Sequence, residues 1–207
     1  AARGSLAQTV LAPSELLANI PDAGGRLPLH AAAASGHAAC LATLISEGFS
    51  LLDEIDVEGD GAIHVAVLHL PDEGVAAEMC HILAKAGATA NLRSASGETA
   101  LHLAAEHGRG SVCSTLLRHA ADANIADGMR HRRPLHLAAG AASIEVCQQL
   151  LAARADLCAM DMDRCTAMMC ASSDPCRGLL ASATRKAERH SYEVAGNVLG
   201  LDSGLSP

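Results

Sequence analysis

The chain has 207 residues and a formal net charge of −8, and half of its residues are hydrophobic although it contains one Phe, one Tyr and no Trp. The negative charge disfavours a general nucleic-acid binder, which relies on Lys and Arg to neutralise phosphates. The sequence has no apolar run of about 18 residues and no signal-peptide pattern, so we expect no membrane insertion. With so few aromatic residues, the core must be built from smaller side chains.

The first segment, residues 1–21, is expected to be a flank that carries a short capping helix. Pro13, Ser14 and Glu15 precede two leucines, which is typical of a helix start, and we expect the helix at Ser14–Asn19. Pro21 ends it, because proline removes a backbone donor. The first residue is Ala rather than Met, which leaves open that the chain is a segment of a longer protein.

One short motif recurs along the rest of the chain. It is Leu-Pro-Leu-His-Ala-Ala at Leu27–Ala32, and closely similar copies lie at Thr99–Ala105 and Arg133–Ala139. Two copies that keep fewer residues of the motif lie at Gly61–Ala66 and Thr166–Ala171. The steps between copies are 34, 38, 34 and 33 residues, measured between His30, His64, His102, His136 and Met169. A period near 33 residues with a Thr-Pro-Leu-His core resembles the ankyrin repeat.

This resemblance implies an all-α solenoid of stacked helix–turn–helix units joined by projecting turns. Five repeats fit within residues 22–180, at about 22–52, 53–90, 91–123, 124–157 and 158–180. For residues 181–207 we expect a C-terminal helix followed by a disordered tail, because the last residues are rich in Gly and Ser.

The helices of repeats one and two follow from the motif copies and from the Gly and Pro residues between them. We expect repeat one to form helices at Pro28–Ser35 and His37–Ser46. Repeat two is expected to form helices at Ala62–His69 and Val75–Lys85. The intervening Leu70–Gly74 contains Pro and Gly and is interpreted as an inserted loop, which explains the 38-residue step.

The last three repeats differ in how well they keep the motif. Repeat three is the most complete, and Thr99 is expected to cap its first helix. Repeat four has Ala142 where the preceding repeat has a glycine after its first helix. Repeat five loses the histidine, and we expect its second helix to be short and to start near Pro175, as in a terminal capping repeat.

Four of the eight cysteines occupy one position of the repeat. Cys80, Cys113, Cys147 and Cys176 each lie three residues before the terminal pair of the second helix, so we expect them to be buried. Adjacent helix layers lie about 8–10 Å apart, which is too far for disulfide bonds. Free thiols favour a reducing compartment, so we expect an intracellular protein of the cytoplasm or nucleus.

Neither the remaining cysteines nor the histidines form a recognisable chemical site. Cys158, Cys165 and Cys170 lack the close Cys pair of zinc motifs. The resemblance implies that the repeated histidines hydrogen-bond within and between the turns. No nucleophile–base set or phosphate-binding loop is present, and we expect no catalytic site, cofactor or metal.

The resemblance implies that a partner protein docks on the turn tips and on the concave ends of the first helices. The residues expected to bind it are Glu58, Asp60, His69, Arg93, Glu98, Glu106, His107, Met129, Arg130, His131, Arg132, Met162 and Arg164. The second turn is acidic and the fourth is basic, which would orient a partner of complementary charge. Ordinary solvated loop charges remain the alternative. Reversing the charges of Arg130 and Arg132 is expected to weaken the partner without changing the melting temperature.

The leading hypothesis is a monomeric, non-enzymatic scaffold or adaptor that binds another protein. The alternative is a regulatory or targeting segment of a larger enzyme, channel or ubiquitin-ligase adaptor. The resemblance also allows hydroxylation of Asn91 or Asn124, which stand at the matching turn positions.

Overall fold

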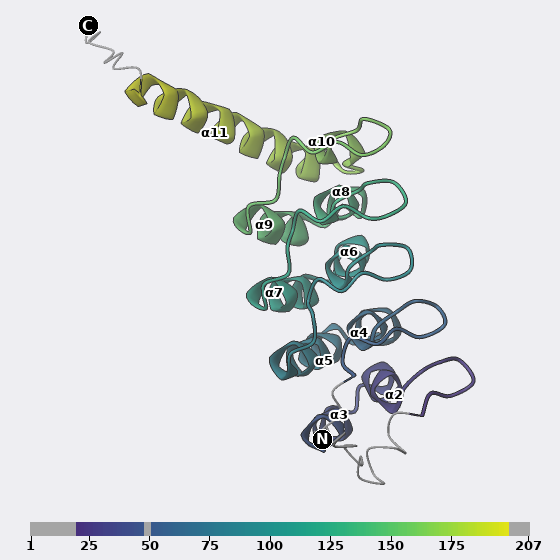
Figure 1. Ribbon diagram of the computed structural model, residues 1–207. Coiled ribbons are helices and arrows are strands. Elements are labelled where there is room, and N and C mark those ends of the chain that lie inside the picture. The colour runs from purple at the N-terminus through teal and green to yellow at the C-terminus, as the bar shows by residue number, and fades with distance from the viewer. Residues whose placement is uncertain (1–19, 48–50, 199–207) are drawn as a thin grey trace, which may run out of the picture.

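The computed structural model describes the backbone of residues 20–47 and 51–198, and side chains as far as residue 189 (Figure 1). The helix expected at Ser14–Asn19 and the tail beyond residue 198 lie outside this range. The described part of the chain is helical and has no strand. Its extended pairing is limited to two isolated antiparallel bridges, Ile55 with Gly61 and Met160 with Thr166.

The helices stack in two parallel rows, from one end of the molecule to the other (Figure 1). The first row contains α2 (Pro28–Ser35), α4 (Ala62–His69), α6 (Ala100–Glu106), α8 (Pro134–Gly140) and α10 (Ala167–Cys170). The second row contains α3 (Ala38–Ser46), α5 (Glu73–Ala86), α7 (Gly110–Arg118), α9 (Ile144–Ala152) and α11 (Asp174–Val198). The turns project as hairpin-like loops on the side of the first row. The expected all-α solenoid is confirmed.

The core repeats with the helices, because each layer contributes the same kind of side chain. The second helix of every repeat carries one leucine with no exposed surface, namely Leu41, Leu83, Leu116, Leu150 and Leu180. Burying a leucine contributes roughly 1.5–3 kcal/mol, so one such residue per layer is a substantial share of the layer's stability. Buried alanines fill the first row, where small side chains let neighbouring helices approach closely.

The expected burial of the repeated cysteines is confirmed. Cys80, Cys113, Cys147 and Cys176 have no exposed surface, and all of them are free thiols. Burial in apolar surroundings raises the pKa of Cys80, Cys113 and Cys147 to about 12. These thiols are therefore un-ionised at neutral pH and serve as small packing groups. Cys40 departs from the pattern and is exposed.

Repeat two differs from expectation at the start of its second helix. Helix α5 begins at Glu73 rather than Val75, because the Asp72 side chain accepts a hydrogen bond from the Val75 amide at 3.0 Å and caps the helix. The extra residues of this repeat therefore lengthen the helix as well as the preceding loop.

The expectation of a short second helix in repeat five is wrong. Helix α11 runs without a break for 25 residues and leaves the stack beyond its first turns (Figure 1). Its buried side chains are Cys176 and Leu180, whereas those of Arg185–Arg189 are exposed. The continuation has a local cause, because residues 181–189 are mostly helix-forming and include no proline.

Candidate partner-binding surface

Each projecting turn is closed at its base by a residue that recurs with the repeat. Asp22, Asp56, Asp127 and Asp161 occupy this place, and Ser94 replaces them in the third turn. In the second turn, the Asp56 carboxylate accepts hydrogen bonds from the backbone amides two and four residues later, at 2.9 and 3.0 Å. The sequence motif did not identify this role, although the five residues follow each other at steps of 34, 38, 33 and 34 residues, close to the repeat period.

Neighbouring turn tips are tied together by their backbones. The amide of Val57 donates to the carbonyl of Gly24 at 3.2 Å, and the amide of Met162 donates to that of Arg130 at 2.9 Å. The two intervening steps are equivalent and join the third turn to the second and the fourth to the third. The tips therefore form one continuous, braced edge.

The repeated histidines brace the turns from below, as expected. Nδ1 of His102 accepts a hydrogen bond from the Thr99 amide at 3.1 Å, and Nε2 donates to the carbonyl of Arg132 in the next turn at 3.2 Å. His30, His64 and His136 make equivalent contacts, and all four side chains are buried. Burial lowers the pKa of His64 and His102, so these rings are neutral and carry the proton on Nε2.

The acidity of the second turn is partly neutralised within the chain. Arg26 in the first turn places Nε 3.2 Å from Asp56 and a terminal nitrogen 3.3 Å from Glu58. Burial would raise the pKa of the Asp56 carboxyl, but hydrogen bonds from the backbone and Arg26 outweigh it and hold the pKa below its usual value. Asp53 accepts a hydrogen bond from the Thr89 amide at 2.8 Å. The expected acidic field is thus weaker than the sequence suggests.

The fourth turn holds its two arginines differently. The buried Asp127 carboxylate accepts hydrogen bonds from the backbone amides of Arg130 and Arg132, and Nε of Arg132 lies 3.0 Å from its other oxygen. Burial would raise the pKa of Asp127, but these hydrogen bonds lower it. The Arg130 guanidinium has no hydrogen-bond or ion-pair partner among the residues that the structure describes, so it is available to a ligand.

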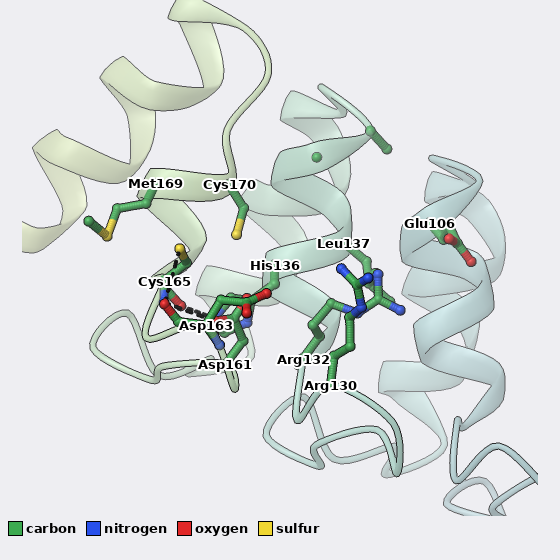
Figure 2. Close-up of a pocket in the computed structure, with 12 residues that line it drawn as sticks. Glu106, Arg130, Arg132, His136, Leu137, Asp161, Asp163, Cys165, Met169 and Cys170 are labelled. Atoms are coloured by element: carbon green, nitrogen blue, oxygen red, sulfur yellow. Dashed lines mark hydrogen bonds between the residues drawn. The ribbon is translucent and has the colours of Figure 1, made fainter.

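A cavity of about 590 Å³ opens between the fourth and fifth turns and the ends of the first-row helices (Figure 2). The guanidinium groups of Arg130 and Arg132 lie together on its wall, with Leu137 of α8 behind them. Glu106 at the end of α6 lies on one side of this pair, and Asp161 and Asp163 of the fifth turn lie on the other. The cavity therefore alternates in charge along the stack.

Two turn residues beside the cavity adopt left-handed backbone conformations. His131 has φ 55° and Arg164 has φ 61°, whereas the first three turns have glycine at the corresponding place, namely Gly25, Gly59 and Gly97. A side chain in this conformation costs roughly 1–2 kcal/mol. Side chains rather than glycine therefore occupy the left-handed position in the two turns beside the cavity.

The cavity brings together only Glu106, Arg130 and Arg132 of the residues expected to bind a partner. Nearby, Met129 and Met162 are 71% and 63% exposed. Other candidates brace the fold or lie towards the other end of the stack, and these are Glu58, Asp60, His69, Arg93, Glu98 and His107. Among the lining residues, Asp161, Asp163, Cys165, Met169 and Cys170 were not identified from the sequence, because the motif does not show that the fifth repeat faces the arginines of the fourth turn.

Among the residues whose side chains the structure describes, 20–47 and 51–189, no group of three or more His, Cys, Asp or Glu side chains is arranged to hold a metal ion. Within the described backbone, residues 20–47 and 51–198, no helix combines the length and apolar character needed to cross a membrane.

The chain is similar to known repeat proteins over most of the stack. A family model described as ankyrin repeats in three copies matches residues 73–161, and a model of the single ankyrin repeat matches residues 24–56. The chain is 37% identical to the nuclear factor NF-kappa-B p105 subunit of Mus musculus over 143 residues, which are 65% of this chain and 14% of that protein. It is 46% identical to neurogenic locus notch homolog protein 1 of Mus musculus over 85 residues, which are 41% of this chain and 3% of that protein. The chain therefore spans a small part of the length of these relatives.

Proposed function

Because the chain belongs to the ankyrin repeat family, we propose that it is a non-enzymatic scaffold or adaptor that binds another protein on its turn tips and concave face. Ankyrin repeats generally mediate protein–protein interaction, and both relatives match this chain through their repeats. The observation that carries the proposal is the braced edge. Turn tips joined by backbone hydrogen bonds present exposed side chains at little entropic cost on binding.

The proposed contacts centre on the fourth and fifth turns. Exposed Met129 and Met162 suit adaptable apolar contacts, and Arg130 supplies a charge with no internal partner in the described structure. The other proposed contact residues are Glu58, Asp60, His69, Arg93, Glu98, Glu106, His107, His131, Arg132 and Arg164. We further propose a monomer that binds no nucleic acid and works in a reducing compartment, the cytoplasm or nucleus, because its cysteines are free thiols.

A second candidate function is that of a regulatory or targeting segment within a larger protein. The observation that favours it is the length of the relatives. The matching region is 14% of the NF-kappa-B p105 subunit and 3% of the notch homolog protein. The binding surface would be the same in both cases.

Site-specific photo-crosslinking tests the proposal. A benzophenone amino acid replaces Met129 or Met162 in the full chain, and the matched control carries it at Gln148, which is exposed on α9 in the second row. In extracts of the source cells, we expect a discrete crosslinked protein from the turn-tip positions and none from the control. Crosslinks from Gln148 alone would contradict the proposal.

Competition adds a quantitative test with matched charge reversals. Arg130→Glu is expected to weaken capture of the crosslinked protein, whereas Arg185→Glu, on the exposed part of α11, is expected to leave it unchanged. Equal loss from both variants would indicate a general charge effect rather than a site at the turns.

A further inference from the structure

The cavity beside the fourth turn has room because α8 ends at a glycine and an alanine follows it. Gly140 and Ala141 stand where the preceding repeat has Glu106 and His107. A Cβ atom added at Gly140 would meet no heavy atom within 4 Å, so a side chain there would project into open space beside the cavity. The fourth repeat therefore leaves open the space that the side chains of Glu106 and His107 occupy in the third repeat.

The arginines of the cavity are oriented to receive an acidic group. The Nε atom of Arg132 is occupied by Asp127, which fixes the side chain and leaves its terminal nitrogens directed into the cavity beside those of Arg130 (Figure 2). Two adjacent guanidinium groups offer the fork-like donors that bind a carboxylate with paired hydrogen bonds.

Carboxylates on both sides restrict what that acidic group can be. The five charged lining residues are two arginines and three acids, Glu106, Asp161 and Asp163, so their net charge is +2 − 3 = −1. A phosphate would place nearly two negative charges among these carboxylates, which disfavours it. A single carboxylate flanked by positive charges would complement the whole cavity.

We propose that this cavity binds a segment of a partner protein in polyproline II conformation, in which one Asp or Glu lies between two basic residues, each three positions away. The acidic residue pairs with Arg130 and Arg132, and the basic residues pair with Glu106 on one side and with Asp161 or Asp163 on the other. Adjacent layers are about 8–10 Å apart, and in polyproline II conformation three residues span about 9 Å and return the side chain to the same face. This inference rests on the proposed function and names the chemistry of the segment that docks there.

The direct test uses synthetic peptides and the full chain labelled with nitrogen-15. The probe is a capped peptide with the central sequence Arg-Ser-Thr-Glu-Thr-Ser-Arg, and the control has the same composition with Glu moved to one end. We expect the probe to shift the amide resonances of Arg130, Gly140 and Ala141 at low salt, and the control to bind about tenfold more weakly, which corresponds to about 1.4 kcal/mol.

Substitutions at Gly140 link the binding to the cavity. Gly140→Glu places a carboxylate facing the arginines, as Glu106 does one layer earlier, and is expected to weaken the probe about tenfold. Gly140→Ala leaves the cavity open and is expected to bind the probe as the natural chain does. Both substitutions are made at the last residue of α8, where an added Cβ atom meets no neighbour, so we expect the fold to be retained.

Three results would overturn the inference: equal binding of the two peptides, unchanged binding to the Gly140→Glu variant, or tighter binding of a peptide with phosphoserine in place of Glu. The last would indicate a phosphorylated partner. These failures are distinct from failure of the proposed function. If the turn-tip crosslinks persist in the Gly140→Glu variant, the surface still binds a protein, and only the assignment of this cavity is wrong.

Discussion

Nε of Arg132 lies 3.0 Å from Oδ2 of Asp127, whose side chain is 1% exposed against 29% for that of the arginine. Both residues stand at the base of the fourth turn, where the Asp127 amide donates to the Arg132 carbonyl at 2.8 Å, and the same carboxylate also accepts hydrogen bonds from two backbone amides. Arg132 therefore supports the turn as well as facing the cavity. The sequence-based expectation that reversing Arg130 and Arg132 together would not change the melting temperature does not agree with this arrangement.

Reversal of Arg132 alone is expected to destabilise the protein. Arg132→Glu leaves the buried Asp127 carboxylate without its cation and adds a like charge beside it. Partial exposure of the arginine moderates the loss, so we expect the free energy of unfolding to fall by about 1–3 kcal/mol. Urea denaturation followed by circular dichroism measures it.

Arg130→Glu is the matched control for this pair. The Arg130 guanidinium has no partner within the described residues, so its reversal should change the free energy of unfolding by less than about 0.5 kcal/mol. Similar losses from both variants would show that Asp127 does not depend on Arg132.

Removal of a repeated histidine is expected to loosen the contact between adjacent repeats. His102→Ala leaves the Thr99 amide and the Arg132 carbonyl without their partner and creates a cavity, at a cost of about 2–4 kcal/mol. His69→Ala, at an exposed position, should cost less than about 0.5 kcal/mol. Amide hydrogen exchange would locate the His102 effect in the third and fourth turns. Uniform loss of protection along the stack would argue against a local role.

Acidification is expected to destabilise the stack through the buried histidines. Burial lowers the folded-state pKa of His64 and His102 below the ordinary value of 6.5. Below that value the unfolded chain binds protons that the folded chain does not, so the free energy of unfolding falls with pH. The loss continues until the pH passes through the lowered folded-state pKa values. We expect a lower urea midpoint at about pH 5.5 than at about pH 7.5.

His102→Gln checks the origin of this pH dependence, because glutamine does not titrate. The variant should be less stable at neutral pH and should show a smaller difference between the two pH values. A pH dependence as large as that of the natural chain would exclude His102 as a source.

The buried thiols are expected to be inert while the protein is folded. Cys80, Cys113 and Cys147 are un-ionised at neutral pH, because burial raises their pKa to about 12. Only thiolates react readily with alkylating reagents. Mass spectrometry after a short iodoacetamide pulse should therefore find label at exposed Cys40 and Cys158 and none at these three. Labelling in urea is the control, and rapid labelling of Cys113 in the folded chain would contradict the packing.

The sequence was sufficient to predict the fold because the same motif recurs in each repeat. Every motif copy places a histidine under a turn and an apolar face on the next layer, so the boundaries of α2 and α4 could be predicted to the residue. The prediction was wrong for α11, where no neighbouring copy constrains the chain. Its length is decided by local helix-forming residues beyond Leu180 instead.

The candidate site was less predictable, because its parts come from different repeats. Arg130 and Glu106 were proposed as separate surface charges, and their placement around one cavity with Asp161 depends on the stacking of three layers. The motif also does not show which charged side chains form ion pairs with each other within the chain. The pairing of Arg26 with Asp56 joins residues 30 positions apart and has no signal beyond the repeat step itself.

The turn after α8 offers two neighbouring substitutions with opposite expected effects. Ala142 has φ 57°, in the left-handed region where the equivalent Gly36 and Gly108 have φ 70° and 65°. An alanine in this conformation costs roughly 1–2 kcal/mol, so Ala142→Gly should raise the free energy of unfolding by about 0.5–1 kcal/mol after the added freedom of the unfolded glycine is counted. Ala141 has φ −74° and ψ −1°, close to the helical region. Ala141→Gly therefore relieves no strain and should lower stability by about 0.5–1 kcal/mol. Urea denaturation of both variants checks the signs, and destabilisation by Ala142→Gly would show that this turn is not strained.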